Sequence, residues 1–370
     1  MDVSTLRIET DAQGHKVINN QYVVSRKLGQ GQYGKVLLAT SKLGTEVAIK
    51  TINRIDRLKL ITKNYLLHAQ KLKREIKIMK ECNHPNVVQL YSVIDDLKFD
   101  KILLVLEYCA YGELEWKNYN HYNEKYYKED GITINKILRD VINGLDYLHN
   151  RKKIIHRDLK PLNLLISVNK TIKISDFGVS LILENNTSDD KELGRLLGTP
   201  AFFAPELCQF VHMRYLQLDL HLAMRDGDRE NVLSTEAAEK YRLNYQIDLW
   251  SLGVILYCLI FHCLPFNGHN EFALFKNIVD KPLSFPKVLS LDLATESDLD
   301  ELRELQDLIT KLLMKDPAKR ATIQDVMCHK FTTYDLSPSK IDEFFSFNTQ
   351  FDSDSGSRSS QSPEPNQGNK

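Results

Sequence analysis

The sequence predicts an α+β protein in which a small antiparallel β-rich part precedes a larger α-helical part. Between Gln21 and Lys50, short apolar runs alternate with glycine-containing turns, which is typical of an antiparallel meander. From Leu58 to Cys82 the apolar residues recur at helical spacing, and after Gly112 the pattern is mostly helical. We therefore expect strands at the start of the chain and helices through most of the remainder.

The β-rich part is expected to continue after the first long helix. The run from Asn83 to Asn86 contains a proline that ends the helix, and strand-like runs follow from Val87 to Leu90 and from Ile102 to Tyr108. These runs complete an expected five-stranded sheet. The most apolar run, from Leu249 to Leu264, is interrupted by polar residues and glycine, so we expect a buried core helix there.

Composition excludes several classes of protein. Of the 370 residues, 42% are apolar and 26% charged, which is ordinary for a globular chain. Lys plus Arg equals Asp plus Glu at 49 each, so no global field favours nucleic acid or an anionic membrane, and we expect neither as a partner. The six cysteines lack paired metal-ligand spacing, and we see no export or lipid signal. We expect a cytoplasmic protein and leave nuclear access open.

The first motif with chemical meaning is a glycine-rich turn between two expected strands. Without Cβ atoms, its backbone N–H groups can approach phosphate oxygens closely. Similar turns open dinucleotide-binding folds, but a helix follows there, whereas Lys35 to Ala39 is strand-like here. A purely structural hairpin remains open at this point. The turn is Gly29-Gln30-Gly31-Gln32-Tyr33-Gly34.

Lys50 lies on the next expected strand, where its ammonium could reach back to phosphates held by the glycine-rich turn. Its candidate partner is Glu75, because apolar residues surround that glutamate in the following helix. A solvated strand lysine and a surface glutamate are the alternatives.

A more specific motif runs from His156 to Asn163, and it supplies a carboxylate at Asp158 and an amide oxygen at Asn163. Asp158 would accept the proton of an acceptor hydroxyl, and Asn163 would bind a metal. Asp176, 13 residues after Asn163, offers a second hard oxygen ligand suited to Mg²⁺. The segment closes at Ala204-Pro205-Glu206, and five motifs in this order exclude chance.

Together these motifs resemble the eukaryotic protein kinase superfamily, from about Tyr22 to Phe331. The resemblance implies the bilobal protein-kinase fold, with ATP and Mg²⁺ as cofactors and a protein as substrate. The expected catalytic domain spans 21–331, with an N-lobe of about 21–108, a C-lobe of about 109–331 and an insert of about 209–245. Extensions cover 1–20 and 332–370, and we expect disorder from about 348.

The resemblance also implies roles for individual residues. Leu106 corresponds to the gatekeeper, Glu107 to Cys109 to the hinge, and Glu113 to the ribose contact. A hydrophobic column of Met79, Leu90, His156 and Phe177 is expected over Asp248, so His156 would be structural. The expected catalytic residues are Lys50, Glu75, Asp158, Lys160, Asn163 and Asp176, and the metal ligands are Asn163 and Asp176. The expected ATP-binding residues are Leu28, Gly29, Gln30, Gly31, Gln32, Tyr33, Gly34, Val36, Ala48, Lys50, Leu106, Glu107, Cys109, Glu113 and Leu165.

Two further runs narrow the resemblance. Lys160 and Gly198-Thr199-Pro200 are similar to the serine/threonine branch, and Glu206 should pair with Arg320. The runs from Ile174 to Ser180 and from Gly198 to Cys208 resemble the calcium/calmodulin-dependent protein kinase kinases and their fungal relatives, which act upstream of AMP-activated (sucrose-nonfermenting) kinases. This implies another kinase's activation-loop threonine as substrate. The alternatives are a calmodulin-regulated or polarity-type kinase and, more remotely, a pseudokinase scaffold.

Regulation is expected to depart from the common pattern. Arg195 and Leu196 stand where many kinases carry an activating phosphothreonine, so constitutive activity is one hypothesis. Arg157 would then contact Glu192 or the Asp189-Asp190 pair, unless those acids are simply solvated. The alternative is phosphorylation at Thr187 or Ser188.

Two other segments bear on regulation. The long stretch between Leu207 and Ile247 is either a docking element or a passive surface loop. Calmodulin binding needs a basic amphipathic helix, and Lys340 is the only basic residue between Thr332 and Phe351, so calmodulin control is doubtful. Ser362, which precedes a proline, could accept phosphate in the tail instead.

Overall fold

The structure is a computed structural model that describes residues 2–31, 34–53, 63–126, 128–129, 131–183, 197–209, 244–286 and 295–351. Several sequence predictions lie outside these residues. They concern most of the insert at 210–243, the tail after 351, and the residues Gln32, Tyr33, Thr187, Ser188, Asp189, Asp190, Glu192, Arg195 and Leu196.

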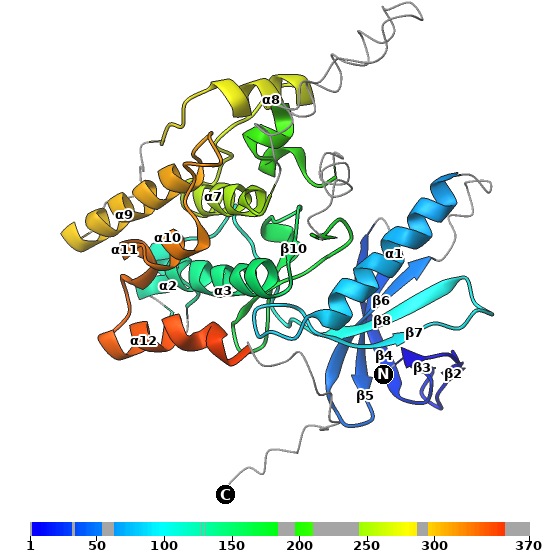
Figure 1. Cartoon of the computed structure of the whole chain (residues 1–370). Helices are drawn as coiled ribbons and strands as arrows, with labels where there is room; N and C mark the ends of the chain where they lie inside the picture. The colour runs from blue at the N-terminus through cyan, green and yellow to red at the C-terminus, as the bar shows by residue number, and fades with distance from the viewer. Residues whose placement is uncertain are drawn as a thin grey trace, which may run out of the picture.

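A single eight-stranded sheet forms the smaller lobe (Figure 1). The strand order is β1-β7-β8-β6-β5-β4-β3-β2, and every neighbouring pair is antiparallel except β1 with β7. The strands are β1 (Asp2–Val3), β2 (Ile8–Thr10), β3 (Lys16–Ile18), β4 (Tyr22–Gly31), β5 (Gly34–Ser41), β6 (Glu46–Asn53), β7 (Leu90–Ile94) and β8 (Lys101–Glu107).

The expected five-stranded sheet was wrong, because the N-terminal residues add three strands to it. Leu6 and Ile18 are buried against Val47 and Ile49 in a separate hydrophobic cluster on one face of the sheet. Burial of these side chains holds the N-terminal strands on the lobe. The expected strand from Val87 was also misplaced, since Val87 forms only an isolated bridge and the strand begins at Leu90.

Alternation along β6 assigns its side chains to two faces. Val47 and Ile49 belong to the cluster with the N-terminal strands, whereas Ala48 belongs to the main core together with Ile78 and Met79 of α1 (Lys63–Glu81). The helix predicted from Leu58 is thus confirmed over the described part of its range. This arrangement directs the side of the sheet that carries Ala48 toward α1.

The larger lobe is mainly helical (Figure 1). Its helix α7 (Gln246–Phe261) is buried along most of its length, as expected for the apolar run from Leu249 to Leu264. The helices are α2 (His121–Tyr126), α3 (Ile134–Asp146), α7 (Gln246–Phe261), α8 (Glu271–Asp280), α9 (Glu296–Leu312), α10 (Ile323–Met327), α11 (Lys330–Thr333) and α12 (Pro338–Ser346). Short strands form two small sheets, with the orders β12-β11-β9 and β10-β13; they are β9 (Gly112–Glu113), β10 (Ile154–Ile155), β11 (Leu164–Ile166), β12 (Ile172–Ile174) and β13 (Leu181–Ile182).

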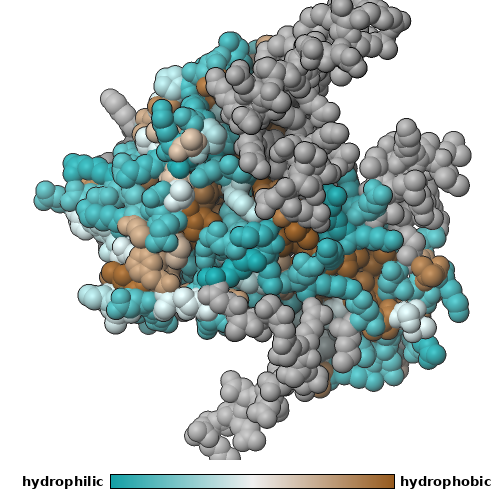
Figure 2. Space-filling view, in the orientation of Figure 1, coloured by the Kyte–Doolittle hydropathy of each residue, from teal (hydrophilic) through white to brown (hydrophobic). Residues whose placement is uncertain are grey.

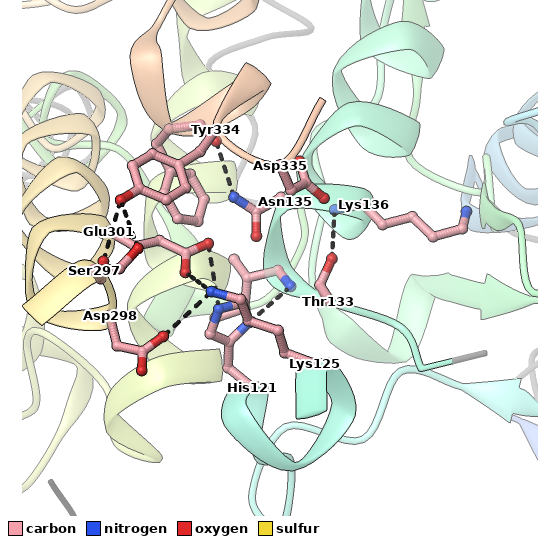
Figure 3. A network of polar contacts seen from close by, with 12 residues as sticks. His121, Lys125, Thr133, Asn135, Lys136, Ser297, Asp298, Glu301, Tyr334 and Asp335 are labelled. Carbon is pink, nitrogen blue, oxygen red and sulfur yellow. Dashed lines mark hydrogen bonds and ion pairs between the residues drawn. The ribbon is translucent and has the colours of Figure 1, made fainter. Parts of the chain in front are cut away.

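A buried ionic network joins α2 to α9 (Figure 3). Lys125 Nζ lies 2.6 Å from Glu301 Oε2 and 3.3 Å from Asp298 Oδ1, and His121 Nε2 lies 3.6 Å from Glu301 Oε1. Burial alone would raise the pKa of Glu301, but hydrogen bonds from His121 and Lys125 outweigh it and lower that pKa. The network therefore carries an ionised carboxylate at neutral pH.

The expectation of disorder from about residue 348 was wrong for residues 348–351. These residues end a short helical turn, Phe347–Phe351, in which Asn348 is buried. On the face seen in Figure 2, most of the described surface is hydrophilic. In the described ranges, no helix combines the length and the apolar character needed to cross a bilayer.

Candidate active site

The predicted pair of Lys50 and Glu75 is present between β6 and α1. Lys50 Nζ donates to Glu75 Oε1 at 2.8 Å and to Asp176 Oδ1 at 3.4 Å. Burial alone would lower the pKa of Lys50, but the two carboxylates outweigh it and raise that pKa. Burial likewise opposes ionisation of Asp176, yet Lys50 lowers the pKa of that carboxyl. At neutral pH the site therefore holds the Lys50 ammonium beside the Asp176 carboxylate.

The second group of predicted residues surrounds the carboxylate of Asp158. Lys160 Nζ donates to Asp158 Oδ2 at 2.7 Å and to Thr199 Oγ1 at 2.7 Å. The hydroxyl of Thr199 donates in turn to Asp158 Oδ1 at 2.8 Å. Asn163 Nδ2 donates to the backbone oxygen of Asp158 at 2.7 Å. Both carboxylate oxygens are thus held in place before any substrate arrives.

Asn163 and Asp176 come together because their backbones are linked through Ser175. The N–H and the hydroxyl of Ser175 both donate to the carbonyl oxygen of Asn163, at 2.9 and 3.0 Å. Asp176 has a φ of 63°, a left-handed conformation that is uncommon outside glycine. The Asn163 amide nitrogen donates to Asp158, so the amide oxygen of Asn163 and the carboxylate of Asp176 are the two hard-oxygen groups that this segment offers. Such hard oxygens fit a divalent metal ion.

A buried aspartate anchors the segment that carries Asp158. Asp248 of α7 accepts the backbone N–H groups of His156 and Arg157 at 2.8 and 2.9 Å, and His149 Nε2 lies 2.8 Å from it. Burial would raise the pKa of Asp248, but the bond to His149 outweighs it and lowers that pKa. The ring of His156 packs edge-on against Phe177, 5.4 Å between centroids. His156 is thus placed in the core, as the sequence predicted.

Strand register brings the expected nucleotide contacts onto two neighbouring surfaces. Val36 pairs with Gly29 on one side and Lys50 on the other, and Ala48 pairs with Leu106. In the larger lobe Leu165 pairs with Glu113. Leu28, Val36 and Leu165 are only partly buried where they meet the core, so they keep surface for a ligand. Val36, Ala48, Lys50 and Leu106 thus lie on three adjacent strands of the smaller lobe, and Leu165 and Glu113 lie on adjacent strands of the larger lobe.

The hinge residues are tied to the larger lobe by a buried lysine. Lys173 Nζ lies 2.9 Å from Glu107 Oε1 and donates to the backbone oxygen of Pro85 at 2.6 Å. Cys109 is buried, which raises the pKa of its thiol to about 12. The hinge therefore presents no thiolate at neutral pH.

The predicted bridge between Glu206 and Arg320 is confirmed. The guanidinium donates to both carboxylate oxygens, at 2.7 and 2.8 Å, and both side chains are almost fully buried. Arg320 also donates to the backbone oxygens of Gln246 and Met314. This bridge fixes the end of the segment that contains Thr199.

Sequence reasoning missed two positioning contacts. Thr199 served only to indicate the serine/threonine branch, although its hydroxyl binds Asp158 and Lys160. Thr51 was not singled out, yet its hydroxyl accepts from Lys35 N at 3.0 Å and donates to Lys35 O at 2.9 Å, beside the glycine-rich turn. Its position directly after Lys50 was the only available signal.

Comparison with known proteins agrees with this geometry, since residues 22–220 and 230–332 match the protein kinase domain family. This chain belongs to that family. The chain is 38% identical over 354 residues to SNF1-activating kinase 1 of Saccharomyces cerevisiae, covering 90% of this chain and 30% of that protein. It is 40% identical to the serine/threonine-protein kinase ssp1 of Schizosaccharomyces pombe, covering 86% of this chain and 43% of that protein.

A plant relative matches over more of its own length. The serine/threonine-protein kinase GRIK1 of Arabidopsis thaliana is 34% identical, covering 87% of this chain and 69% of that protein. Against the first two relatives, by contrast, this kinase spans less than half of the relative's length. Protein kinases as a family use ATP with a divalent metal ion and act on protein substrates.

Proposed function

We propose that this kinase transfers the γ-phosphoryl group of Mg²⁺-bound ATP to the activation-segment threonine of a second kinase of the SNF1 (AMP-activated) type. The observation that carries the proposal of catalysis is the geometry at Asp158, whose carboxylate is held by Lys160 and Thr199. The proposal of substrate is supported by the relatives, one of which is named as an activator of SNF1.

Asp158 orients the acceptor hydroxyl and takes its proton as the hydroxyl oxygen attacks the γ-phosphorus, while the bond from that phosphorus to the β,γ-bridging oxygen breaks and ADP leaves. Lys160, 2.7 Å from Asp158 Oδ2, places a positive charge beside the negative charge that develops during transfer. Lys50 is held by Glu75 so that its ammonium points toward Asp176, where the phosphates are expected. Positioning and charge thus supply most of the catalysis.

Asn163 and Asp176 would hold the Mg²⁺ ion, which when bound neutralises phosphate charge. The ionised Asp176 carboxylate and the amide oxygen of Asn163 are ligands that Mg²⁺ prefers, and phosphates and water would complete its coordination. In the described ranges, no group of three or more His, Cys, Asp or Glu side chains is arranged to hold a metal. A site with few protein ligands suits Mg²⁺, because it usually keeps several waters.

The test is transfer to a purified, inactive SNF1-type catalytic subunit with ATP and Mg²⁺, scored at its activation-segment threonine by mass spectrometry. Asp158→Asn should lose nearly all transfer, because it keeps the shape of the side chain but cannot take the proton. Lys319→Met, a change at an exposed side chain that pairs with Asp316, is the matched control and should retain activity. A substrate with alanine in place of the threonine checks the site of transfer.

Each result has a defined meaning. Site-specific transfer that is lost in Asp158→Asn and in the alanine substrate supports the whole proposal. Transfer to generic peptides but not to this threonine would reject the substrate and keep the kinase. No transfer to any peptide would reject catalysis. A further arm with Ca²⁺ and calmodulin decides whether calmodulin acts on this kinase at all.

A further inference from the structure

The C-terminal residues 337–351, which we name the C-terminal strap, lie outside the residues that match the protein kinase family. The strap comprises α12 and the helical turn Phe347–Phe351, and it runs along α3 toward the smaller lobe (Figure 1). Just before it, Asp335 accepts two hydrogen bonds from Arg139 of α3, at 2.5 and 3.0 Å. Phe344 of α12 is buried in the main core. The strap is therefore attached to the large lobe along its length.

At its far end the strap inserts one polar side chain between the two lobes. Asn348 is 4% exposed. Its Nδ2 donates to the backbone oxygen of Asn143 at 3.0 Å and to Asp146 Oδ2 at 2.6 Å, both in α3. Its Oδ1 accepts from His84 Nε2 at 3.0 Å, and His84 lies in the loop that joins α1 to β7. One side chain thus links a helix of the large lobe to a loop of the small lobe.

His84 is held in a defined orientation and charge state. Its ring stacks on Tyr147 at 4.7 Å, and the rings of Phe347 and Phe351 meet it edge-on at 5.7 and 4.7 Å. Burial lowers the pKa of His84 to about 4, so the ring is neutral at physiological pH. Nδ1 accepts the backbone N–H of Asn86, and the single ring proton is therefore on Nε2, where it faces the strap.

The same cluster is connected to the end of α1. The hydroxyl of Tyr147 accepts the backbone N–H of Asn83 at 2.9 Å and donates to the carbonyl oxygen of Glu81, the last residue of α1, at 3.4 Å. Glu75 lies less than two turns earlier in that helix and pairs with Lys50. A shift of the loop would therefore move the glutamate that orients the catalytic lysine.

We propose that the C-terminal strap is a positioning element for the active site, with Asn348 and Phe351 as the positioning residues. They hold His84 and Tyr147 together, and these in turn hold the C-terminal end of α1, so that Glu75 stays within bonding distance of Lys50. The inference rests on the proposed function for its catalytic consequence, whereas its structural consequence can be measured without activity.

The experiment compares hydrogen–deuterium exchange and kinetics of the full chain in two test variants and two control variants. Asn348→Leu keeps a similar shape but removes three hydrogen bonds, and Phe351→Ala removes one ring in case the first variant does not fold. Thr349→Val is the matched control, because among the described residues the Thr349 hydroxyl donates to Ser346 O, inside the strap. Phe351→Tyr, unlike Phe351→Ala, keeps an aromatic ring at this position. Its exchange rates and its kcat/KM should therefore match those of the unmodified chain.

Exchange of peptides covering residues 75–84 should accelerate about tenfold or more in Asn348→Leu, while peptides from α7 stay unchanged. The value of kcat/KM for ATP should fall about tenfold with the same variant, and Thr349→Val should change neither. Equal acceleration in α7 would mean that the strap only stabilises the fold, and no acceleration at 75–84 would mean that it holds nothing there. Either result overturns the proposal.

The two proposals can fail separately. If the unmodified chain transfers no phosphate but exchange still responds locally, the proposed function fails and the positioning by the strap stands. If the unmodified chain is active and Asn348→Leu keeps full kcat/KM, the strap inference fails alone.

Discussion

Replacing Arg320 tests how strongly the structure depends on a buried ion pair. Arg320→Met removes the two bonds to Glu206 and leaves that carboxylate buried without its counter-charge. It also leaves the backbone oxygens of Gln246 and Met314 without this donor. Breaking one partner of a buried pair costs about 3–5 kcal/mol, which is a fall in Tm on the order of 10 °C for a lobe of this size.

The assay is urea unfolding followed by tryptophan fluorescence. Trp250 reports directly on the site, because the Arg320 guanidinium lies 5.2 Å from its ring centroid. The double variant Glu206→Leu with Arg320→Met should be more stable than Arg320→Met alone, since no unpaired charge is left in the core. Lys319→Met, which breaks only an exposed pair at 3.6 Å, should cost less than about 0.5 kcal/mol.

Two outcomes would refute this reasoning. A loss below about 1 kcal/mol in Arg320→Met would mean that Glu206 is solvated or protonated once it loses its partner. A double variant whose loss equals the sum of the two single losses would mean that the two side chains act independently.

Three further predictions follow from other parts of the chain. Gly34→Ala should raise KM for ATP and lower thermal stability, because the added Cβ would overlap the backbone oxygen of Thr51; steady-state kinetics and a melting curve measure both. Iodoacetamide at pH 7.5 should label the exposed Cys263 and spare Cys109, whose burial raises its pKa to about 12; peptide mass spectrometry reports the sites. The pKa of Glu301 is lower in the folded state than the value of about 4.3 for an unfolded glutamate, so its ionised carboxylate stabilises the fold above about pH 4.3. This contribution is lost as the pH falls through the folded-state pKa. Glu301→Gln should therefore flatten the fall of Tm between pH 6 and pH 3, which melting curves at several pH values measure.

Each of the three has its own contradiction. Unchanged kinetics and stability in Gly34→Ala would show that the turn can shift to admit a methyl group. Rapid labelling of Cys109 would show that the hinge opens in solution. A Tm profile that is equally steep with and without Glu301→Gln would show that other carboxyls dominate the acid response.

The chemistry of the site was readable from the sequence because each motif is short and local. Asp158, Lys160 and Asn163 lie within six positions of one another, so their spacing alone predicts that they share one loop. Lys50 could be assigned to the same site because it lies on the strand after the glycine-rich turn, and Asp176 because it follows Asn163 by 13 residues. The structure then supplied what spacing cannot, namely that Thr199 closes the group around Asp158.

The structure of the N-terminal strands and of the C-terminal strap could not be predicted, because these segments are held in place by contacts between residues far apart in the sequence. His84 and Asn348 are 264 positions apart, and neither belongs to a periodic pattern that indicates a partner. Leu6 and Ile18 lie in a mostly polar stretch with few apolar neighbours, so nothing local shows that they cover the sheet. Their role follows only once β6 is known to turn Val47 and Ile49 toward that face.

The N-terminal strands have a practical consequence for anyone who produces this kinase in recombinant form. A chain trimmed at the edges of the family match, to residues 22–332, would uncover Val47, Ile49 and Val105, which Leu6 and Ile18 help to cover. It would also open the edge of β7, which β1 otherwise pairs. An exposed apolar surface beside an unpaired strand edge promotes association between copies of the chain. We therefore expect a chain trimmed to residues 22–332 to be poorly soluble.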